Sequence, residues 1–361
     1  MNVSSFLSVA ASLIFLGESA PGADLRNQFI GFTNFSTFEK TPGTNSGETI
    51  LTSPEITAHL TWDELVVSWN AEMPDGAYIK VEAQAIYDEK ATKYYTMGLW
   101  SADPTRHPRE SVPHQKDEQG DVSTDTLILK QPCERLQVRL TLGGDSENKP
   151  KLKLLGLALT DSKSNSSALE PHKAAWGKTI PVPERSQMAY PNGGVLCSPT
   201  TVSMLLSYWS KTLQQPNLDC DVPEVAKGVF DEKWKGAGNW PFNMAYAGAF
   251  PGMRAYVSRF SDVSELEDWI AAGLPVGLSL DHDRLRGKGP GPNGHLVVCV
   301  GFTQDGDVIL NDPGTSKNVR KIFPRKSLIY AWAYSRNTVY LIYPDTATIP
   351  MDRFGHWSLG Q

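Results

Sequence analysis

Cys197 lies in a sequence context that could support nucleophilic chemistry. In the segment GGVLCSPTTVSMLLSYW, two glycines end a loop and an amphipathic pattern begins almost at the cysteine, with Pro199 in the expected first turn of a helix. A helix N-terminus presents unpaired N–H groups and the positive end of a dipole, and both favour a thiolate over a thiol. The position predicts an activated nucleophile. A small buried residue at a helix start would give the same pattern.

His295 and Asp312 lie on two successive predicted strands, HLVVCVGF and DVILND, with a hairpin turn signal at 305–306 between them. A turn there pairs Cys299 with Asp312. Alternation then places His295 and Asp312 on one face of the sheet and Asn311 on the other. This register leaves the two side chains about four residues apart along the strand, so a bulge or strand twist must bring them together. We therefore predict a base oriented by Asp312, against the alternative of a structural histidine.

Two other side chains are candidates for a catalytic role: Gln187 as an oxyanion donor and His282 as the base in place of His295. Gln187 precedes the cysteine in VPERSQMAYPNGG, where its amide could stabilise an oxyanion together with the Cys197 N–H, although an exposed loop glutamine is the alternative. His282, in LDHDRLRG, is a rival base. Because its loop is rich in Gly and Pro, we expect it to be mobile and to orient an imidazole poorly.

The order of these residues resembles papain-like cysteine peptidases of the bacteriocin-leader-processing (C39-like) type, in which GH, an apolar strand and NDP are typical. The resemblance covers about residues 180–343, and GNWPFNMAYAG is similar to soluble bacterial relatives with a β-rich N-terminal domain. It implies a papain-like fold and a thioester mechanism that needs no cofactor or metal. The nucleophile, the base, its orienting residue and the oxyanion donor would be Cys197, His295, Asp312 and Gln187. Ser198 replaces the glycine of many relatives.

The elements that must position these residues divide the chain of 361 residues into two domains. Residues 24–160 show short alternating segments such as AYIKVEAQAIY and ERLQVRLTL, which predict an all-β sandwich. Residues 161–178 form a polar linker, which favours independently folded domains. Residues 179–345 place helical patterns before strands, the order of an α+β domain, and 346–361 form a C-terminal tail.

Composition and termini narrow the function further. Lys and Arg total 34 against 40 Asp and Glu, without a basic stripe, which argues against nucleic acid as a partner. Residues 1–23 contain a short apolar run ending in small residues, as in a secretory signal peptide, and no later segment reaches membrane-spanning length. The four cysteines lack the spacing of a disulfide scaffold or a zinc site, and we expect Cys299 to be a buried thiol.

These observations predict a secreted or periplasmic bacterial cysteine peptidase that hydrolyses peptide or protein substrates. Its N-terminal domain would position the substrate, for example a cell-surface polymer. Two alternatives remain. One is a cell-surface or carbohydrate-binding protein whose papain-like domain is idle, and the other is an amidase or acyltransferase that uses the same thioester. A complete Cys, His and Asp set favours an enzyme.

Overall fold

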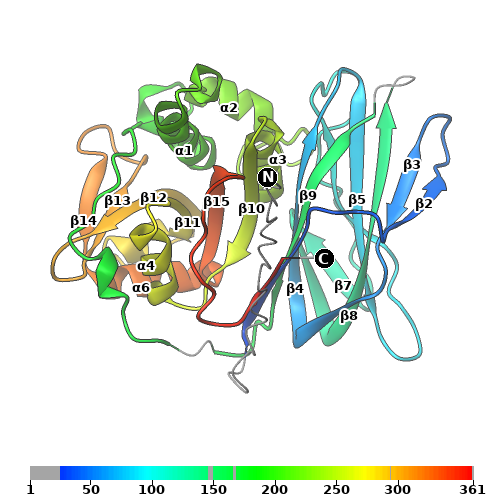
Figure 1. The fold of residues 1–361 in the computed structure, drawn as a ribbon, viewed down its shortest axis with the longest axis horizontal. Coiled ribbons are helices and arrows are strands. Elements are labelled where there is room, and N and C mark those ends of the chain that lie inside the picture. Colours follow the sequence, from blue (N-terminus) through cyan, green and yellow to red (C-terminus); the bar gives the residue numbers. More distant parts are fainter. Residues whose placement is uncertain (1–24, 145–148, 166–167, 293, 360–361) are drawn as a thin grey trace, which may run out of the picture.

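The computed structural model describes residues 25–144, 149–165, 168–292 and 294–359, and the expected signal peptide, residues 1–23, lies outside them. Two domains lie side by side, a β-rich N-terminal domain and a C-terminal domain that combines helices with a sheet (Figure 1). This order confirms the expected succession of a β-rich domain and an α+β domain. None of the helices in the described part of the chain has the length and apolarity that a membrane crossing needs.

The N-terminal domain is built on two long strands that pair with several shorter ones. Its strands are β1 (Asn27–Phe32), β2 (Glu39–Pro42), β3 (Thr49–Thr52), β4 (Ile56–Glu72), β5 (Ala77–Ile86), β6 (Tyr95–Ser101), β7 (Gly120–Ser123), β8 (Thr126–Gly144) and β9 (Lys151–Thr160). The strand β4 pairs first with β8 and then with β9. All these strands belong to one hydrogen-bonded network, and their arrangement as a sandwich stays a prediction.

Burial along β4 shows where the second domain packs. From Ile56 to Thr61 buried and exposed residues alternate, as in a strand with one solvated face, but from Trp62 to Ala71 every residue is buried. Continuous burial means that this half of β4 is covered on both faces, one of them by α3 and β10 of the C-terminal domain. Figure 1 shows β4 and β9 on the side of the domain that faces α3 and β10 of its neighbour.

The C-terminal domain places helices against a six-stranded sheet. Its helices are α1 (Cys197–Leu213), α2 (Val222–Val229), α3 (Trp240–Ala249), α4 (Val263–Ala271), α5 (His282–Leu285) and α6 (Arg325–Trp332). Its strands are β10 (Met253–Arg259), β11 (Val276–Asp281), β12 (Gly294–Phe302), β13 (Val308–Asn311), β14 (Arg320–Phe323) and β15 (Thr338–Pro344). The sheet order is β10-β15-β11-β12-β13-β14 with antiparallel neighbours, and α1 lies against β12, β15 and β11.

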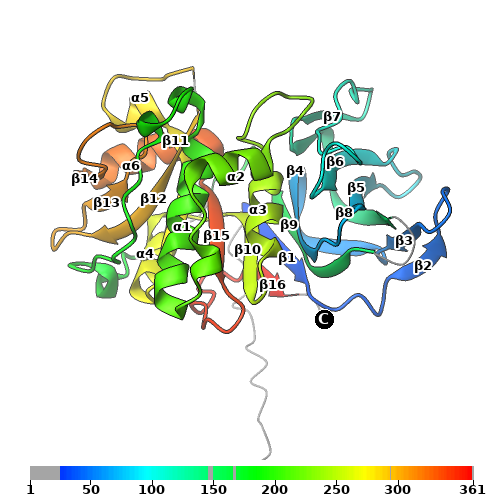
Figure 2. The same cartoon turned by 90° about the horizontal axis from the view of Figure 1, so that it is seen from above.

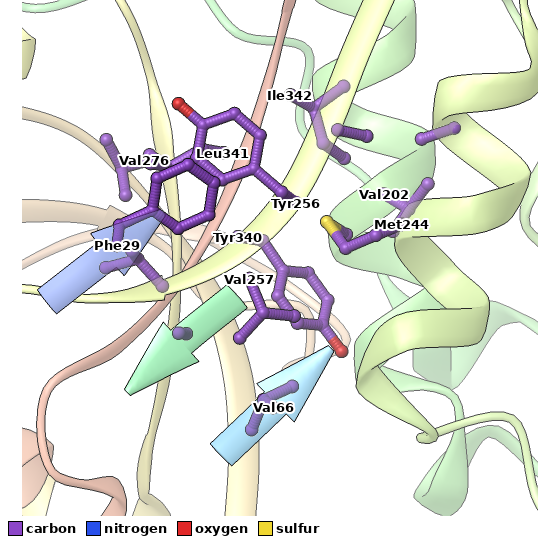
Figure 3. Close-up of a cluster of buried hydrophobic side chains, with 14 of the residues drawn as sticks. Phe29, Val66, Val202, Met244, Tyr256, Val257, Val276, Tyr340, Leu341 and Ile342 are labelled. Carbon is purple, nitrogen blue, oxygen red and sulfur yellow. The ribbon is translucent and has the colours of Figure 1, made fainter. Parts of the chain in front are cut away.

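The hydrophobic core runs through both domains. Phe29 and Val66 of the N-terminal domain lie in the same cluster as Tyr256, Val257 and Tyr340 of the C-terminal domain (Figure 3). The ring centroids of Phe29 and Tyr256 are 4.4 Å apart. The structure therefore does not support the expected independent folding of the domains. The polar composition of a linker indicates that the linker itself is solvated. It does not indicate whether the two domains pack against each other.

Side chains of β4 also satisfy the free edge of the second sheet. Since β10 is an edge strand, the outer N–H and C=O groups of its backbone have no neighbouring strand. The Asn70 side chain accepts from the Ala255 N–H at 2.9 Å and donates to the Ala255 carbonyl at 2.7 Å. The Ser68 hydroxyl accepts from the Val257 N–H at 2.9 Å. The N-terminal domain thus completes hydrogen bonding of the C-terminal sheet.

The expected linker and tail both contact the domains. The indole of Trp176 donates to Glu267 at 2.6 Å, which attaches the end of the linker to α4. The last strand, β16 (Trp357–Leu359), pairs in parallel with β1. The strand β16 therefore returns the chain to the N-terminal domain.

Candidate active site

Cys197 is the first residue of α1, as the sequence predicts. Its N-cap residue, Leu196, offers no side-chain cap, and the backbone N–H of Ser198 in the first turn hydrogen-bonds the thiol. Cys197 is half-buried, and its thiol forms a side-chain hydrogen bond with His295. Burial alone would raise the pKa of Cys197, but the hydrogen bond and positive charge of His295 outweigh burial and lower this pKa below its ordinary value.

The three other cysteines are buried and free, including Cys299, as expected. Burial raises the pKa of Cys133 to about 12 and that of Cys220 to about 11. Burial also raises the pKa of Cys299. The only cysteine with a lowered pKa among the described residues is thus the one at the helix start.

His295 and Asp312 meet because the register of β12 and β13 differs from the predicted one. The imidazole Nε2 and Asp312 Oδ1 are 2.8 Å apart. The predicted pairing of Cys299 with Asp312 is wrong, because Cys299 faces Leu310 and the register shifts between Cys299 and Gly301. The turn pairs Phe302 with Val308 instead of Ile309, which shifts the register by one residue, and the bulge shifts it by one more, so that Asp312 lies nearer His295 along the strand. With Nε2 on the carboxylate, Nδ1 is the ring nitrogen left for Cys197.

The prediction that Asn311 is separate from the histidine is confirmed. Its amide donates to the backbone carbonyls of Val182 and Pro183, each at 3.3 Å, and its carbonyl oxygen accepts from Arg320 at 3.0 Å. Asn311 therefore anchors the segment that leads to Gln187 and does not orient the imidazole.

Asp312 is fully buried and has several donors. Its Oδ1 also accepts from the Gly314 N–H at 2.9 Å, and its Oδ2 accepts from the Arg286 guanidinium at 2.8 Å. Burial would raise the pKa of Asp312, but the nearby histidines and Arg286 hold it far below its usual range. Burial would likewise lower the pKa of His295, yet its contacts with Asp312 and Cys197 raise that pKa to about 9. The arrangement favours a thiolate and imidazolium pair.

Gly314 lies so close to the His295 imidazole that a side chain there would crowd the ring. A Cβ at this residue would lie 3.0 Å from Cε1 and 3.1 Å from Nε2 of His295. The close approach of backbone to imidazole thus favours glycine, because a Cβ would require the ring to shift by a few tenths of an ångström. The NDPG sequence contained this signal, which sequence reasoning missed.

Gln187 is buried at the site rather than exposed in a loop. It begins a short 3₁₀ turn (Gln187–Ala189), and its backbone N–H donates to the Pro313 carbonyl at 3.0 Å, next to Asp312. Its amide Nε2 donates one N–H to the Gly193 carbonyl at 2.7 Å, while Oε1 is buried without a hydrogen-bond partner. A second N–H on Nε2 therefore remains for another acceptor.

His282 does not lie in a mobile loop, contrary to the expectation. It begins α5, whose N-cap, Asp281, accepts from two backbone N–H groups of that helix. The imidazole is 4.3 Å from the His295 ring, centroid to centroid, and its Nε2 is 3.8 Å from Asp312 Oδ2, beyond hydrogen-bond distance. It contacts the base rather than replacing it.

A metal ion would compete with Arg286 at this position. One nitrogen each of His282 and His295 and one Asp312 oxygen lie within 4.8 Å of one another, a spacing that a metal could use. The guanidinium of Arg286 already occupies Asp312 Oδ2 and places a positive charge beside the three ligands. The donor set is thus better suited to a proton and an arginine than to a divalent cation.

The thiol opens into a cleft of about 930 Å³ between the domains. Residues of the C-terminal domain form one part of its lining, including Cys197 and Leu296. Glu64, residues 123–126 and Ile128 of the N-terminal domain form another. Nothing in the sequence reveals this second wall, because it exists only through the packing of the two domains.

Comparison with known proteins supports a peptidase family. Residues 37–160 match the model of the Peptidase C39 N-terminal domain, and residues 179–340 match the model of the Peptidase_C39 like family. No match was found among curated proteins.

Two solved structures are similar only at a low level. A Bacillus anthracis protein described as a C39-like peptidase is 18% identical, with a TM-score of 0.37, over 47% of this chain and 99% of that chain. The Clostridium thermocellum endo-1,4-beta-D-xylanase 10B, with CBM22-1 and GH10 modules and xylohexaose, is 7% identical, with a TM-score of 0.18, over 50% of this chain and 36% of that chain. Neither score supports an argument about this chain.

The two family models together cover most of both domains, and the second one covers the domain that carries Cys197, His295 and Asp312. The domain that carries these three residues therefore matches the C39-like peptidase family.

Proposed function

We propose that this protein is a cysteine peptidase in which Cys197 is the nucleophile, His295 the general base and acid, and Asp312 the residue that orients His295. The observation that carries the proposal is the position of the imidazole, which binds Asp312 through Nε2 and contacts the thiol at a helix N-terminus. This is the relation of nucleophile, base and orienting group that acyl transfer requires.

The reaction would proceed in two halves. The Cys197 thiolate attacks the carbonyl carbon of the peptide bond, and the electron pair of the C=O bond moves to the oxygen. As the C–N bond breaks, the His295 imidazolium donates its proton to the departing amine, which leaves a thioester on Cys197. Water then attacks the thioester, His295 accepts a proton from it, and the C–S bond breaks to release the acid.

The oxyanion would be stabilised by Gln187 and by the backbone N–H of Cys197. Gln187 Nε2 retains one N–H beside its bond to Gly193, and its backbone is anchored to the loop that follows Asp312. Preorganised donors of this kind stabilise charge that develops in the transition state.

The chemistry would be the same for an amide other than a peptide bond. We keep peptides as the proposed substrate because the family is one of peptidases. We also propose export, on the basis of the apolar N-terminal run, and a substrate-positioning role for the N-terminal domain. The idle-domain alternative is less well supported, since Cys197, His295 and Asp312 are assembled with a lowered thiol pKa.

The first test is selective alkylation at pH 6 with iodoacetamide, followed by peptide mapping. We expect Cys197 to react much faster than the buried Cys133, Cys220 and Cys299, because only its pKa is lowered among these four. The wild-type chain should cleave members of an unstructured peptide library, and Cys197→Ala should cleave none. Equal labelling of Cys220, or full cleavage by Cys197→Ala, would contradict the proposal.

A further inference from the structure

The cleft at Cys197 is lined by exposed apolar side chains from both domains. Within the described residues, ten large apolar side chains are exposed, and four of them line this cleft: Ile128, Val195, Trp234 and Tyr334. Ile128 comes from β8 of the N-terminal domain and is 41% exposed. Soluble proteins rarely leave apolar side chains gathered at one place unless they bind something.

These side chains lie close to the reacting groups. Val195, 69% exposed, is two residues before Cys197. Tyr334 lies against Gly294, the residue before His295, where a Cβ would be 3.4 Å from its ring. A peptide whose scissile bond reaches Cys197 must therefore pass these apolar surfaces.

Trp234 is fixed in the cleft before any substrate arrives. It belongs to the loop between α2 and α3, which lies between the two domains (Figure 2). A Cβ on Gly236 would be 2.7 Å from the Trp234 ring, so the indole packs directly on this glycine. The buried Asp231 carboxylate accepts from the Trp234 N–H at 2.9 Å and from the Ser111 N–H of the N-terminal domain at 3.1 Å. Such preorganisation lowers the entropic cost of binding.

The charged residues of the cleft largely satisfy one another. The Glu64 carboxylate is 2.8 Å from Arg259 and 2.9 Å from Arg336. Asp125 accepts from the Trp240 N–H at 2.9 Å and the Thr126 hydroxyl at 3.1 Å. Lys235 also lines the cleft and is exposed, with its ammonium 3.5 Å from Glu232, so the exposed lining combines the four apolar side chains with this lysine.

We infer that Ile128, Val195, Trp234 and Tyr334 form an apolar subsite that recognises large aliphatic or aromatic side chains next to the bond attacked by Cys197. The substrate class is an extended peptide with apolar residues at the cleavage site, selected jointly by both domains. This inference rests on the proposed peptidase function. The cleft volume of about 930 Å³ lies within the range of about 300 to 1,000 Å³ that is typical of ligand pockets.

The test compares two dipeptidyl chloromethyl ketones, one with two leucines and one with two aspartates. Each alkylates the Cys197 sulfur with loss of chloride, so the labelling rate reports binding without requiring turnover. Iodoacetamide, which has no peptide portion, gives the reference rate of the thiol. We expect the leucine probe to label wild type at least about tenfold faster than the aspartate probe, since one apolar contact commonly changes rates by about 10- to 200-fold.

Ile128→Glu should slow labelling by the leucine probe about tenfold and leave the iodoacetamide rate unchanged. Trp234→Ala should have the same effect and provides a second variant if the first is unstable. The matched control is Ile322→Glu, the same substitution at an exposed residue of β14 outside the cleft, which should change neither rate.

Equal rates for the two peptidyl probes on wild type would overturn the subsite, as would an equal loss in Ile322→Glu and Ile128→Glu. In both cases the proposed peptidase function would stand as long as iodoacetamide labels Cys197 selectively. Failure of Cys197 to react with iodoacetamide would instead overturn the peptidase function.

Discussion

At the scale of single residues, the site is organised by how charge is distributed over three side chains. Asp312 holds its negative charge because three donors surround the carboxylate. They are the Arg286 guanidinium, the His295 imidazole and the Gly314 N–H. That charge stabilises the protonated form of His295, and the imidazolium in turn stabilises the Cys197 thiolate. Removal of the Asp312 charge should therefore also change the pKa of the Cys197 thiol, although His295 lies between the two residues.

The pH dependence of kcat/KM tests this chain of effects. The pKa of His295, about 9 against an ordinary value of 6.5, predicts an alkaline limb near pH 9. Asp312→Asn keeps an oxygen acceptor for Nε2 but removes the negative charge. We expect kcat/KM to fall by about 10²-fold or more and the alkaline limb to move to lower pH. A variant with reduced rate and an unmoved limb would show that Asp312 only positions the ring.

The same shift has a consequence for stability. The folded protein binds the His295 proton more tightly than the unfolded chain does, because the folded pKa is the higher one. The resulting stabilisation is fully present below about pH 6.5 and is lost as the pH rises through about 9.

At the scale of elements, the β-bulge in β12 supplies one of the two register shifts that bring Asp312 towards His295. The bulge coincides with the passage of residues 178–180 beside the strand. The Ile180 N–H donates to the Val300 carbonyl at 2.7 Å, and the Phe302 N–H donates to the Lys178 carbonyl at 3.1 Å. Gly301 makes room for this segment, since a Cβ there would be 2.1 Å from the Lys178 carbonyl oxygen.

Gly301→Ala should therefore destabilise the protein and disturb the site together. Overpacking commonly costs about 1 to 3 kcal/mol, and a clash with backbone, which cannot rotate away, belongs at the upper end of that range. We expect a lower urea midpoint and slower alkylation of Cys197 by iodoacetamide at pH 6. If the midpoint and the alkylation rate both match wild type, the bulge does not depend on this glycine.

The bulge also shows what the sequence could and could not predict. The helix start at Cys197 and the presence of a turn near 305–306 depend on local residues, so both were predictable from their neighbours. The turn spans Thr303–Asp307 and pairs Phe302 with Val308 rather than with the predicted Ile309. The two-strand pairing was predictable in outline, but its register was not, because the bulge lies beside residues 178–180, a distant part of the chain whose contacts no local pattern shows. His282 was assigned to a mobile loop because α5 has only four residues, too few to produce a helical pattern.

At the scale of the whole molecule, the two domains share both a core and an active-site cleft. The surfaces that meet are formed by residues far apart in the sequence, such as Phe29 with Tyr256 and Glu64 with Arg259. No local pattern encodes these contacts, so the linker composition suggested more independence than the structure has. We therefore expect a single cooperative unfolding transition rather than two.

The contact between Asn70 and the edge of β10 provides the sharpest test of this dependence. Asn70 is fully buried and serves both the N–H and the carbonyl of Ala255. Asn70→Ala leaves these two groups buried without partners, and each such group costs about 1 to 3 kcal/mol. We expect a lower urea midpoint with one transition retained when unfolding is followed by fluorescence and by circular dichroism. Asn217→Ala, at an exposed asparagine, is the matched control and should match wild type.

A fragment that begins at Trp176 tests the whole interface between the domains rather than one side chain. Removal of the N-terminal domain would expose Tyr256 and its neighbours and leave the edge of β10 without Asn70 and Ser68. An uncovered apolar face beside an open edge strand favours aggregation. We expect the fragment to be insoluble or unfolded, as judged by size-exclusion chromatography and circular dichroism, although it contains all the proposed catalytic residues. A soluble fragment whose Cys197 still reacts with iodoacetamide at the wild-type rate would show that the C-terminal domain folds alone and that the shared core adds stability only.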